Sequence, residues 1–144
     1  MPVIQDRDQA RLVFVQTWQK VRQGSPLQPM EITIADVIVM HPEYQLLLSS
    51  PQKAYEAESV TESGAINPFL HMGMHIALRE QVQTDRPNGI VDLYKDAIDR
   101  FGDVHAAEHQ MMECLGEVLW HASRRDGLPD ESAYLACLRH RIHP

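Results

Sequence analysis

The chain has 144 residues and a formal net charge of −7. This length fits one domain with a substantial hydrophobic core. The acidic balance argues against a nucleic-acid binder and against electrostatic attraction to anionic membranes, because both of those partners are polyanions. We therefore expect a single domain over residues 1–144 that binds neither nucleic acid nor membrane.

Proline and glycine divide the first fifty residues into predicted helices. Asp6–Arg22 carries apolar residues at helical spacing and is followed by Gly24. The apolar stretch Met30–His41 contains many β-branched residues, so a strand competes with a helix there. Pro29 and the length of the stretch favour a buried helix. A further helical segment is predicted over Glu43–Leu48.

The middle of the chain contains both the least patterned segment and the clearest helix start. Gln52–Ile66 has few large apolar residues, and it is either a weak helix over Lys53–Glu58 or a mobile loop. Asn67 followed by Pro68 predicts a helix start, because asparagine caps helices and proline suits the first helical position. This helix is expected to run to about Thr84.

Three more helices are predicted in the second half of the chain, over Ile90–Phe101, Asp103–Arg125 and Asp130–Arg139. Gly102 ends the first of them, and an aspartate caps each of the other two. Short connections between helices favour antiparallel neighbours. The predicted fold is all-α, a single-domain helical bundle of about four main helices plus shorter ones.

Cys114 and Cys137 both fall within apolar helical patterns and form no CxxC motif. Cytosolic proteins keep such buried thiols reduced, so we expect two thiols and no disulfide. The first residues lack a charged leader followed by an apolar segment, and no apolar run reaches the roughly 20 residues of a membrane-spanning helix. The expected location is therefore cytoplasmic.

Two pairs of histidines are the most informative feature of the sequence. His71 and His75 lie four residues apart in one predicted helix, and His105 and His109 repeat this spacing in another. Residues four apart share a helix face, where two imidazoles are close enough to bind one metal ion. His41, in the segment HPEY, is a further candidate ligand.

Glu108 lies beside the second histidine pair, in the middle of an apolar helix face. That face is formed by Met111, Met112, Leu115 and Leu119. Burying an ionised carboxylate is costly, so Glu108 requires a cation, a protonated histidine or a metal ion. The segment HAAEH also fits the H-x-x-E-H pattern of inverted zinc peptidases. If the protein is an enzyme, this pattern predicts Glu108 as the catalytic base.

A second interpretation of the same residues needs no metal. The histidines, Glu108 and Arg79 form a buried hydrogen-bond network that fixes the register of the helices. His121, His140 and His143 belong to neither interpretation, and they are predicted to lie on the surface near helix ends.

Five sequence segments carry a resemblance to a known family. They are HPEY, NPFLHMGMHIALREQ, DRPNGI, HAAEHQMMECLGEVLW and YLACLR. By these segments the chain resembles a bacterial family of short proteins, catalogued as the domain of unknown function number eighteen forty-one. The resemblance extends from Arg7 to Arg139 and implies no activity, because the family has no assigned function.

The two interpretations predict different functions. In the first, a small protein binds a transition metal through His71, His75, His105, His109, Glu108 and His41. Zinc is expected, with iron or nickel as alternatives, because imidazole binds all three; a protein without a cofactor is an equal alternative. As an enzyme it would be a metal-dependent hydrolase. In the second, the protein is a non-enzymatic structural or interaction protein. A homodimer is the candidate assembly, and the sequence indicates no other protein partner.

Overall fold

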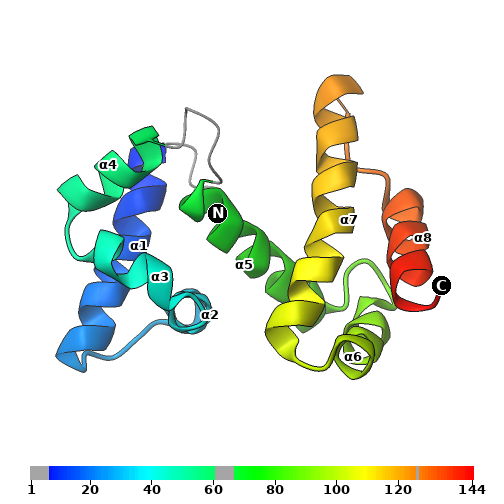
Figure 1. The fold of residues 1–144 in the computed structure, drawn as a ribbon, viewed down its shortest axis with the longest axis horizontal. Helices are drawn as coiled ribbons and strands as arrows, with labels where there is room; N and C mark the ends of the chain where they lie inside the picture. The colour runs from blue at the N-terminus through cyan, green and yellow to red at the C-terminus, as the bar shows by residue number, and fades with distance from the viewer. Residues whose placement is uncertain (1–6, 61–66, 126) are drawn as a thin grey trace. The chain divides into compact units, whose positions relative to one another are not determined.

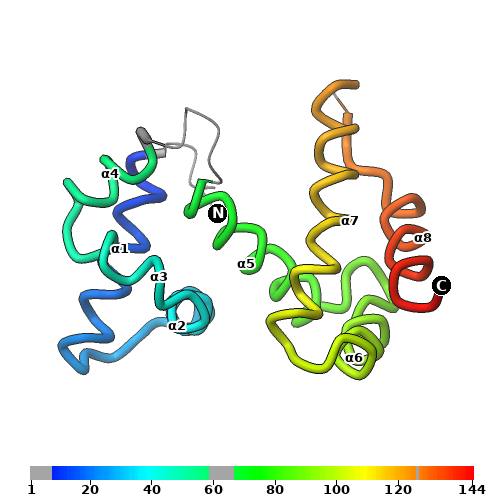
Figure 2. Tube along the Cα trace, in the orientation of Figure 1, coloured from blue at the N-terminus to red at the C-terminus, as the bar shows by residue number. Residues whose placement is uncertain are grey.

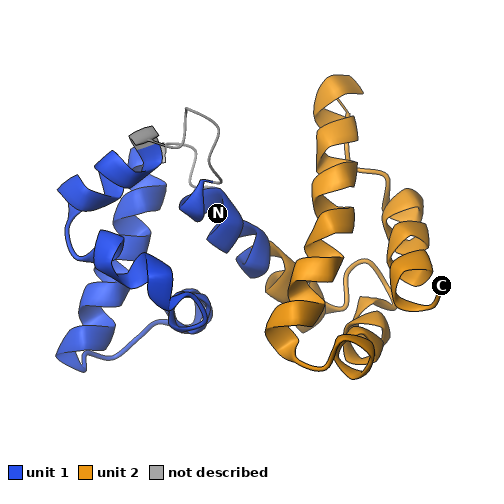
Figure 3. Ribbon diagram, viewed as in Figure 1, with its two compact units in different colours: residues 1–76 blue, residues 77–144 orange. Residues whose placement is uncertain are grey.

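The computed structural model describes residues 7–60, 67–125 and 127–144, which form helices and no β-strand (Figure 1). The all-α prediction is confirmed. Packing divides the chain into two compact units, Met1–Ile76 and Ala77–Pro144 (Figure 3). The single domain over residues 1–144 stays a prediction. None of the described helices has both the length and the apolar character that a membrane crossing requires.

The elements of unit 1 follow the chain in order. They are α1 (Arg7–Gln23), α2 (Pro29–Val39), α3 (Pro42–Gln45), the 3-10 helix η1 (Leu46–Leu48), α4 (Pro51–Val60) and the first part of α5 (Pro68–Thr84). The first predicted helix is confirmed as α1, although Asp6 lies outside the described residues. The segment predicted over Glu43–Leu48 is split into α3, which is labelled in Figure 2, and η1. In Gln52–Ile66 the helix alternative is correct as far as Val60, and residues 61–66 are not described.

The β-branched stretch forms the helix α2, and the chemistry of its first turn gives a reason. Pro29 occupies the first turn, where a missing backbone N–H costs nothing. The Glu31 carboxylate accepts a hydrogen bond from the backbone N–H of Gln28 at 2.8 Å. It also pairs with Lys20 Nζ of α1 at 2.8 Å. The strand alternative for this stretch is therefore wrong.

The core of unit 1 brings together side chains from α1, α2, η1, α4 and the start of α5. Phe14 and Phe69 meet edge to face, with ring centroids 5.6 Å apart. The remaining buried members are Val15, Ile34, Val37, Ile38, Leu48, Ala54 and Met72. Next to this core, a buried ion pair between Arg11 and Glu58 joins α1 to α4. Burial of these apolar faces holds the short helices of unit 1 together.

The start of α5 follows the predicted capping pattern. Asn67 Oδ1 accepts a hydrogen bond from the Phe69 N–H at 2.9 Å, and Pro68 takes the first helical position. Asn67 Nδ2 also donates to Glu58 Oε2 at 3.3 Å, which connects the helix start to α4. The boundary between the two units falls inside α5, so this one helix contributes residues to both.

Replacing Asn67 with alanine is expected to lower the free energy of unfolding by about 1 kcal/mol, the usual cost of losing an N-cap. Urea denaturation of the native and variant proteins measures the difference. Asn67→Ser is the control, because serine retains a capping oxygen and is expected to unfold closer to the native midpoint. An Asn67→Ala midpoint equal to the native one would contradict the capping role.

Unit 2 contains the rest of α5, followed by α6 (Ile90–Phe101), α7 (Val104–Arg125) and α8 (Glu131–Ile142). Both predicted aspartate caps are confirmed. Asp103 Oδ1 accepts from the Ala106 N–H at 2.7 Å, and Asp130 Oδ1 accepts from the Ala133 N–H at 3.1 Å. Gly102 ends α6 with a φ of 97°, a left-handed conformation that glycine adopts without steric cost.

α7 and α8 lie side by side, and α6 packs against both (Figure 1). α8 ends at Ile142 and not near Arg139 as predicted, because burial of the Ile142 side chain stabilises its last turn. The prediction that Leu119 belongs to the apolar face of α7 is wrong, because Leu119 is 42% exposed. The other three members, Met111, Met112 and Leu115, are buried.

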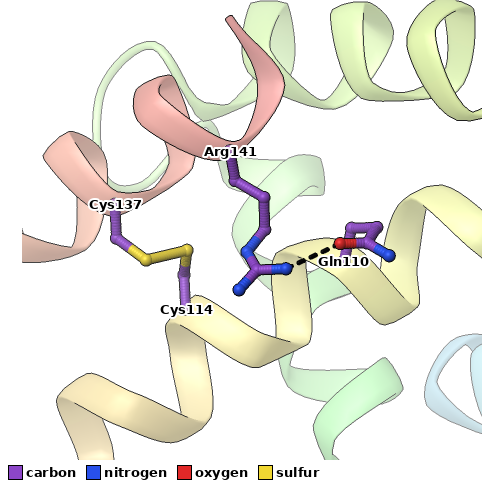
Figure 4. Close-up of a disulfide and its surroundings, with 4 residues drawn as sticks. All are labelled: Gln110, Cys114, Cys137 and Arg141. Atoms are coloured by element: carbon purple, nitrogen blue, oxygen red, sulfur yellow. Dashed lines mark hydrogen bonds between the residues drawn. A yellow bond between two sulfur atoms is a disulfide. The ribbon is translucent and has the colours of Figure 1, made fainter. Parts of the chain in front are cut away.

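The two cysteines form a disulfide, so the prediction of two reduced thiols is wrong (Figure 4). Cys114 of α7 and Cys137 of α8 have Cα atoms 5.8 Å apart, within the range that a disulfide spans. Their sequence separation of 23 residues gives no hint of the bond, because it depends on α7 packing against α8. Cytosolic disulfides in most organisms are transient, catalytic or redox-sensing. The cytoplasmic location stays a prediction.

Reducing this disulfide is expected to lower the free energy of unfolding by about 3 kcal/mol, because the cross-link restricts the unfolded chain. Urea denaturation with and without dithiothreitol measures the loss. The double variant Cys114→Ser/Cys137→Ser is the control, and it should unfold like the reduced protein whether or not reductant is present. Equal stability of the oxidised and reduced proteins would contradict the prediction.

Candidate metal centre

Three of the predicted ligands, His41, His71 and His75, lie together in unit 1. Their ligand nitrogens are within 4.8 Å of one another. The ring centroids are 5.0 Å apart for His41 and His71, 4.8 Å for His41 and His75, and 4.9 Å for His71 and His75. A zinc ion binds imidazole nitrogens at about 2.0–2.1 Å, so modest ring movements place all three around one ion.

Two of these histidines are positioned by α5 itself. His71 and His75 are one helical turn apart, which places their rings on one face of the helix, as predicted. His75 is 0% exposed and His71 is partly buried. Met72, next to His71 in the sequence, belongs to the core of unit 1. Packing of α5 into that core therefore carries both imidazoles away from solvent.

His41 joins them because α2 ends in front of Pro42. The residue before a proline is disfavoured in the helical conformation, and His41 has φ −125° and ψ 70°. Its backbone N–H consequently bonds the Ile38 carbonyl at 3.0 Å and not the carbonyl four residues back. That carbonyl, of Val37, instead lies 2.7 Å from Nδ1 of the His41 ring.

The bond to Val37 determines the tautomer of His41. A carbonyl oxygen only accepts, so Nδ1 carries the proton, and in the neutral ring the lone pair is then on Nε2. Metal-binding histidines almost always donate their other ring N–H to a carboxylate, a carbonyl or water. His41 is 1% exposed and stacks on Tyr44 with ring centroids 5.3 Å apart. Its ring is therefore held in the tautomer and orientation that a metal ligand requires.

The second histidine pair lies in unit 2. His105 and His109 are both on α7, and their ring centroids are 4.3 Å apart. Their ligand nitrogens also lie within 4.8 Å of each other. The four-residue spacing thus places these two imidazoles side by side, as the helical pattern indicates.

Glu108 is 0% exposed, so its predicted burial is confirmed. Arg79 Nε donates to Glu108 Oε2 at 3.0 Å, and the Tyr94 hydroxyl donates to the same oxygen at 2.5 Å. Burial of the ring, together with this bond to Glu108, raises the pKa of Tyr94, so the phenol keeps the proton that it donates. Arg79 and Tyr94 thus supply this carboxylate with a charged and a neutral donor.

These contacts weaken the inference that the buried Glu108 carboxylate indicates a metal ion. A buried carboxylate needs a positive partner, and Arg79 supplies one, so Glu108 does not by itself require a metal ion. Arg79 was predicted to lie near the site, whereas Tyr94 was not. A usable signal exists, because Tyr94 lies one helical turn after the buried Ile90 and therefore near the inward face of α6.

The three remaining histidines outside the two sets, His121, His140 and His143, are exposed as predicted. His143 Nε2 lies 2.9 Å from Asp96 Oδ2, which connects the end of α8 to α6. His121 lies on α7, the helix that also carries His105 and His109. It provides a matched surface position for comparison with the buried histidines.

Comparison with known families agrees with the resemblance seen in the sequence. The family described as Domain of unknown function (DUF1841) matches residues 6–140, nearly the whole chain. The chain belongs to this family. The description of DUF1841 names no activity, substrate or cofactor. No curated protein and no solved structure matches the chain.

Proposed function

We propose that the protein binds a transition metal ion through its histidines, with zinc as the first candidate and iron or nickel as alternatives. His41, His71 and His75 are the proposed core of the site, and His105 and His109 are proposed as further ligands of the same ion. Imidazole nitrogen suits all three metals. With only the three histidines of unit 1 bound, a four-coordinate ion keeps one position open.

The observation that carries the proposal is the 2.7 Å bond between His41 Nδ1 and the Val37 carbonyl. It matches the arrangement of a metal-binding histidine, in which one nitrogen is bonded to the protein and the other is the ligand. His71 and His75 lie beside that ring with their own nitrogens within 4.8 Å. Burial of His41 and His75 supports the proposal further, because a dry site strengthens a metal–ligand bond.

Helix geometry supports adding the pair from α7. His75 and Arg79 are one turn apart on α5 and share a helix face. Arg79 bonds Glu108, and Glu108 lies between His105 and His109 in the sequence of α7. Within unit 2, the second pair therefore flanks in sequence the residue that Arg79 contacts.

Zinc held by imidazoles supplies Lewis acidity, the basis of metal-dependent hydrolysis. Hydrolysis with Glu108 as the base is the finer proposal, and it relies on the H-x-x-E-H pattern. The bonds from Arg79 and Tyr94 to Oε2 hold Glu108 in one orientation. We therefore propose that the primary role of Glu108 is to fix α7 next to α5 and α6. The zinc content of the double variant Arg79→Leu/Glu108→Leu tests whether Glu108 is also a ligand.

A second candidate function is that of a structural or interaction protein without metal, and the contacts of Glu108 favour it. Arg79 and Tyr94 satisfy the buried carboxylate with donors from α5 and α6. In that case the histidines complete a polar network that specifies how helices pack. A homodimer is the assembly proposed for this function.

Metal content of protein purified without a histidine tag tests the proposal. We expect about one ion per chain, as in mononuclear zinc sites. His41→Gln, His71→Gln and His75→Gln should each lose the ion. His121→Gln is the control, because it removes an exposed imidazole from α7 and should retain it.

The α7 pair is tested separately with His105→Gln and His109→Gln. Loss of the ion in both supports five histidine ligands, whereas full retention limits the site to the three histidines of unit 1. Native protein without metal, and with no rise in melting temperature on addition of zinc, nickel or iron(II), would overturn the metal proposal in favour of the structural one.

A further inference from the structure

The two cysteines of the disulfide between α7 and α8 differ in exposure. Cys114 is 0% exposed, whereas Cys137 is only partly buried. Figure 4 shows the bond running from the α7 backbone to that of α8. A thiolate that attacks a disulfide has to reach one of its sulfurs, so the rate at each sulfur depends on access. Because Cys137 is the more exposed residue of the two, we expect attack on the side of Cys137.

α8 is also held to unit 2 by contacts that do not involve sulfur. The Tyr134 hydroxyl donates to Gln81 Oε1 at 2.7 Å, and the Tyr134 ring is 3% exposed. Arg141 Nη1 donates to Gln110 Oε1 at 2.7 Å, one helical turn from the disulfide on each helix (Figure 4). Leu138 and Ile142 add buried apolar surface. We expect these contacts to keep α8 in place when the sulfur–sulfur bond is open.

We propose that Cys114 and Cys137 are a reversible redox pair, which exchanges with small thiols such as glutathione or with the dithiol of a reductase, and that the attack occurs at Cys137. The pair is independent of the metal proposal, because neither cysteine belongs to the histidine sets. In this proposal both redox states share the same fold.

The exchange takes place in two balanced steps. A thiolate attacks Cys137 Sγ, forms a mixed disulfide with it and expels Cys114 as a thiolate, which takes up a proton. A second thiolate attacks the outer sulfur of the mixed disulfide, and Cys137 leaves and is protonated in turn. Two thiols, or one dithiol, are thereby oxidised to a disulfide while the protein disulfide gains two electrons.

The first test uses the native chain, equilibrated in buffers with increasing ratios of reduced to oxidised glutathione. Alkylation followed by mass spectrometry counts the free thiols, and circular dichroism reports helix content. We expect full and reversible conversion between disulfide and dithiol with an unchanged helical signal. The proposal is overturned if both thiols alkylate in the folded protein before any reductant is added, or if reduction occurs only together with loss of helix.

The second test locates the attack with a matched pair of variants, Cys114→Ala and Cys137→Ala. Each retains one thiol and is treated with oxidised glutathione. We expect the thiol of Cys137 to form the mixed disulfide rapidly, and the thiol of Cys114 to react far more slowly until denaturant is added. Equal rates, or faster reaction at Cys114, would overturn the assignment to Cys137. If a variant fails to fold, partial reduction of the native chain decides, since the first mixed disulfide is mapped by peptide mass.

Discussion

Zinc at a thousandfold excess over its dissociation constant is expected to raise the free energy of unfolding by about 4 kcal/mol, and His75→Gln is expected to abolish this gain. His75 is 0% exposed, and its ring lies within 4.9 Å of both His41 and His71. Glutamine remains polar but removes one of the three imidazoles that define the site. Urea denaturation with and without zinc measures the effect.

The comparison is made within each protein, because a substitution at a buried position lowers stability even without metal. His121→Gln is the matched control on an exposed histidine and should be stabilised by zinc as much as the native protein. The metal proposal would be contradicted if zinc stabilised His75→Gln and native protein equally.

Replacing Arg79 with leucine is expected to lower the free energy of unfolding by about 3–5 kcal/mol, because it removes the cation that balances the buried charge of Glu108. The Glu108 side chain is fully buried and that of Arg79 is 17% exposed, so solvent provides little compensation. The Tyr94 hydroxyl still donates to Glu108, but a neutral donor does not balance the charge. Urea denaturation near neutral pH measures the loss.

The double variant Arg79→Leu/Glu108→Leu is expected to recover much of this loss, because replacing both members of a buried ion pair with apolar residues is often close to neutral. Together with Arg79→Leu and Glu108→Leu, it completes a double-mutant cycle. An Arg79→Leu protein as stable as the native one would contradict the role of the ion pair. The double variant also keeps all the histidines, so its zinc content shows whether Glu108 is needed as a ligand.

Helix starts were predictable wherever the chemistry of the first turn is explicit in the sequence. Asn67, Asp103 and Asp130 each accept a hydrogen bond from the backbone of the helix that follows. These signals depend only on residues within one turn. The prediction was weaker over Gln52–Ile66 and at the end of α8, where packing against other helices decides whether a turn is stable.

In the candidate site, too, local features were predictable and long-range contacts were not. Local spacing was enough to predict the all-α class, the two histidine pairs and the burial of Glu108, because residues four apart share a helix face whatever surrounds the helix. The packing of helices against one another selects the residues that contact Glu108 from distant positions in the sequence. Tyr94 reaches Glu108 across 14 positions and Arg79 reaches it across 29.

Dependence on helix packing also explains why the disulfide and the position of His41 were not predicted. The disulfide joins residues 23 positions apart, and its formation depends on α8 packing against α7. His41 was recognisable only as a candidate, because its place beside His71 and His75 results from α2 packing near α5 and ending at Pro42. Local spacing determines which side chains share a face, whereas burial of apolar surface between helices determines which faces come together.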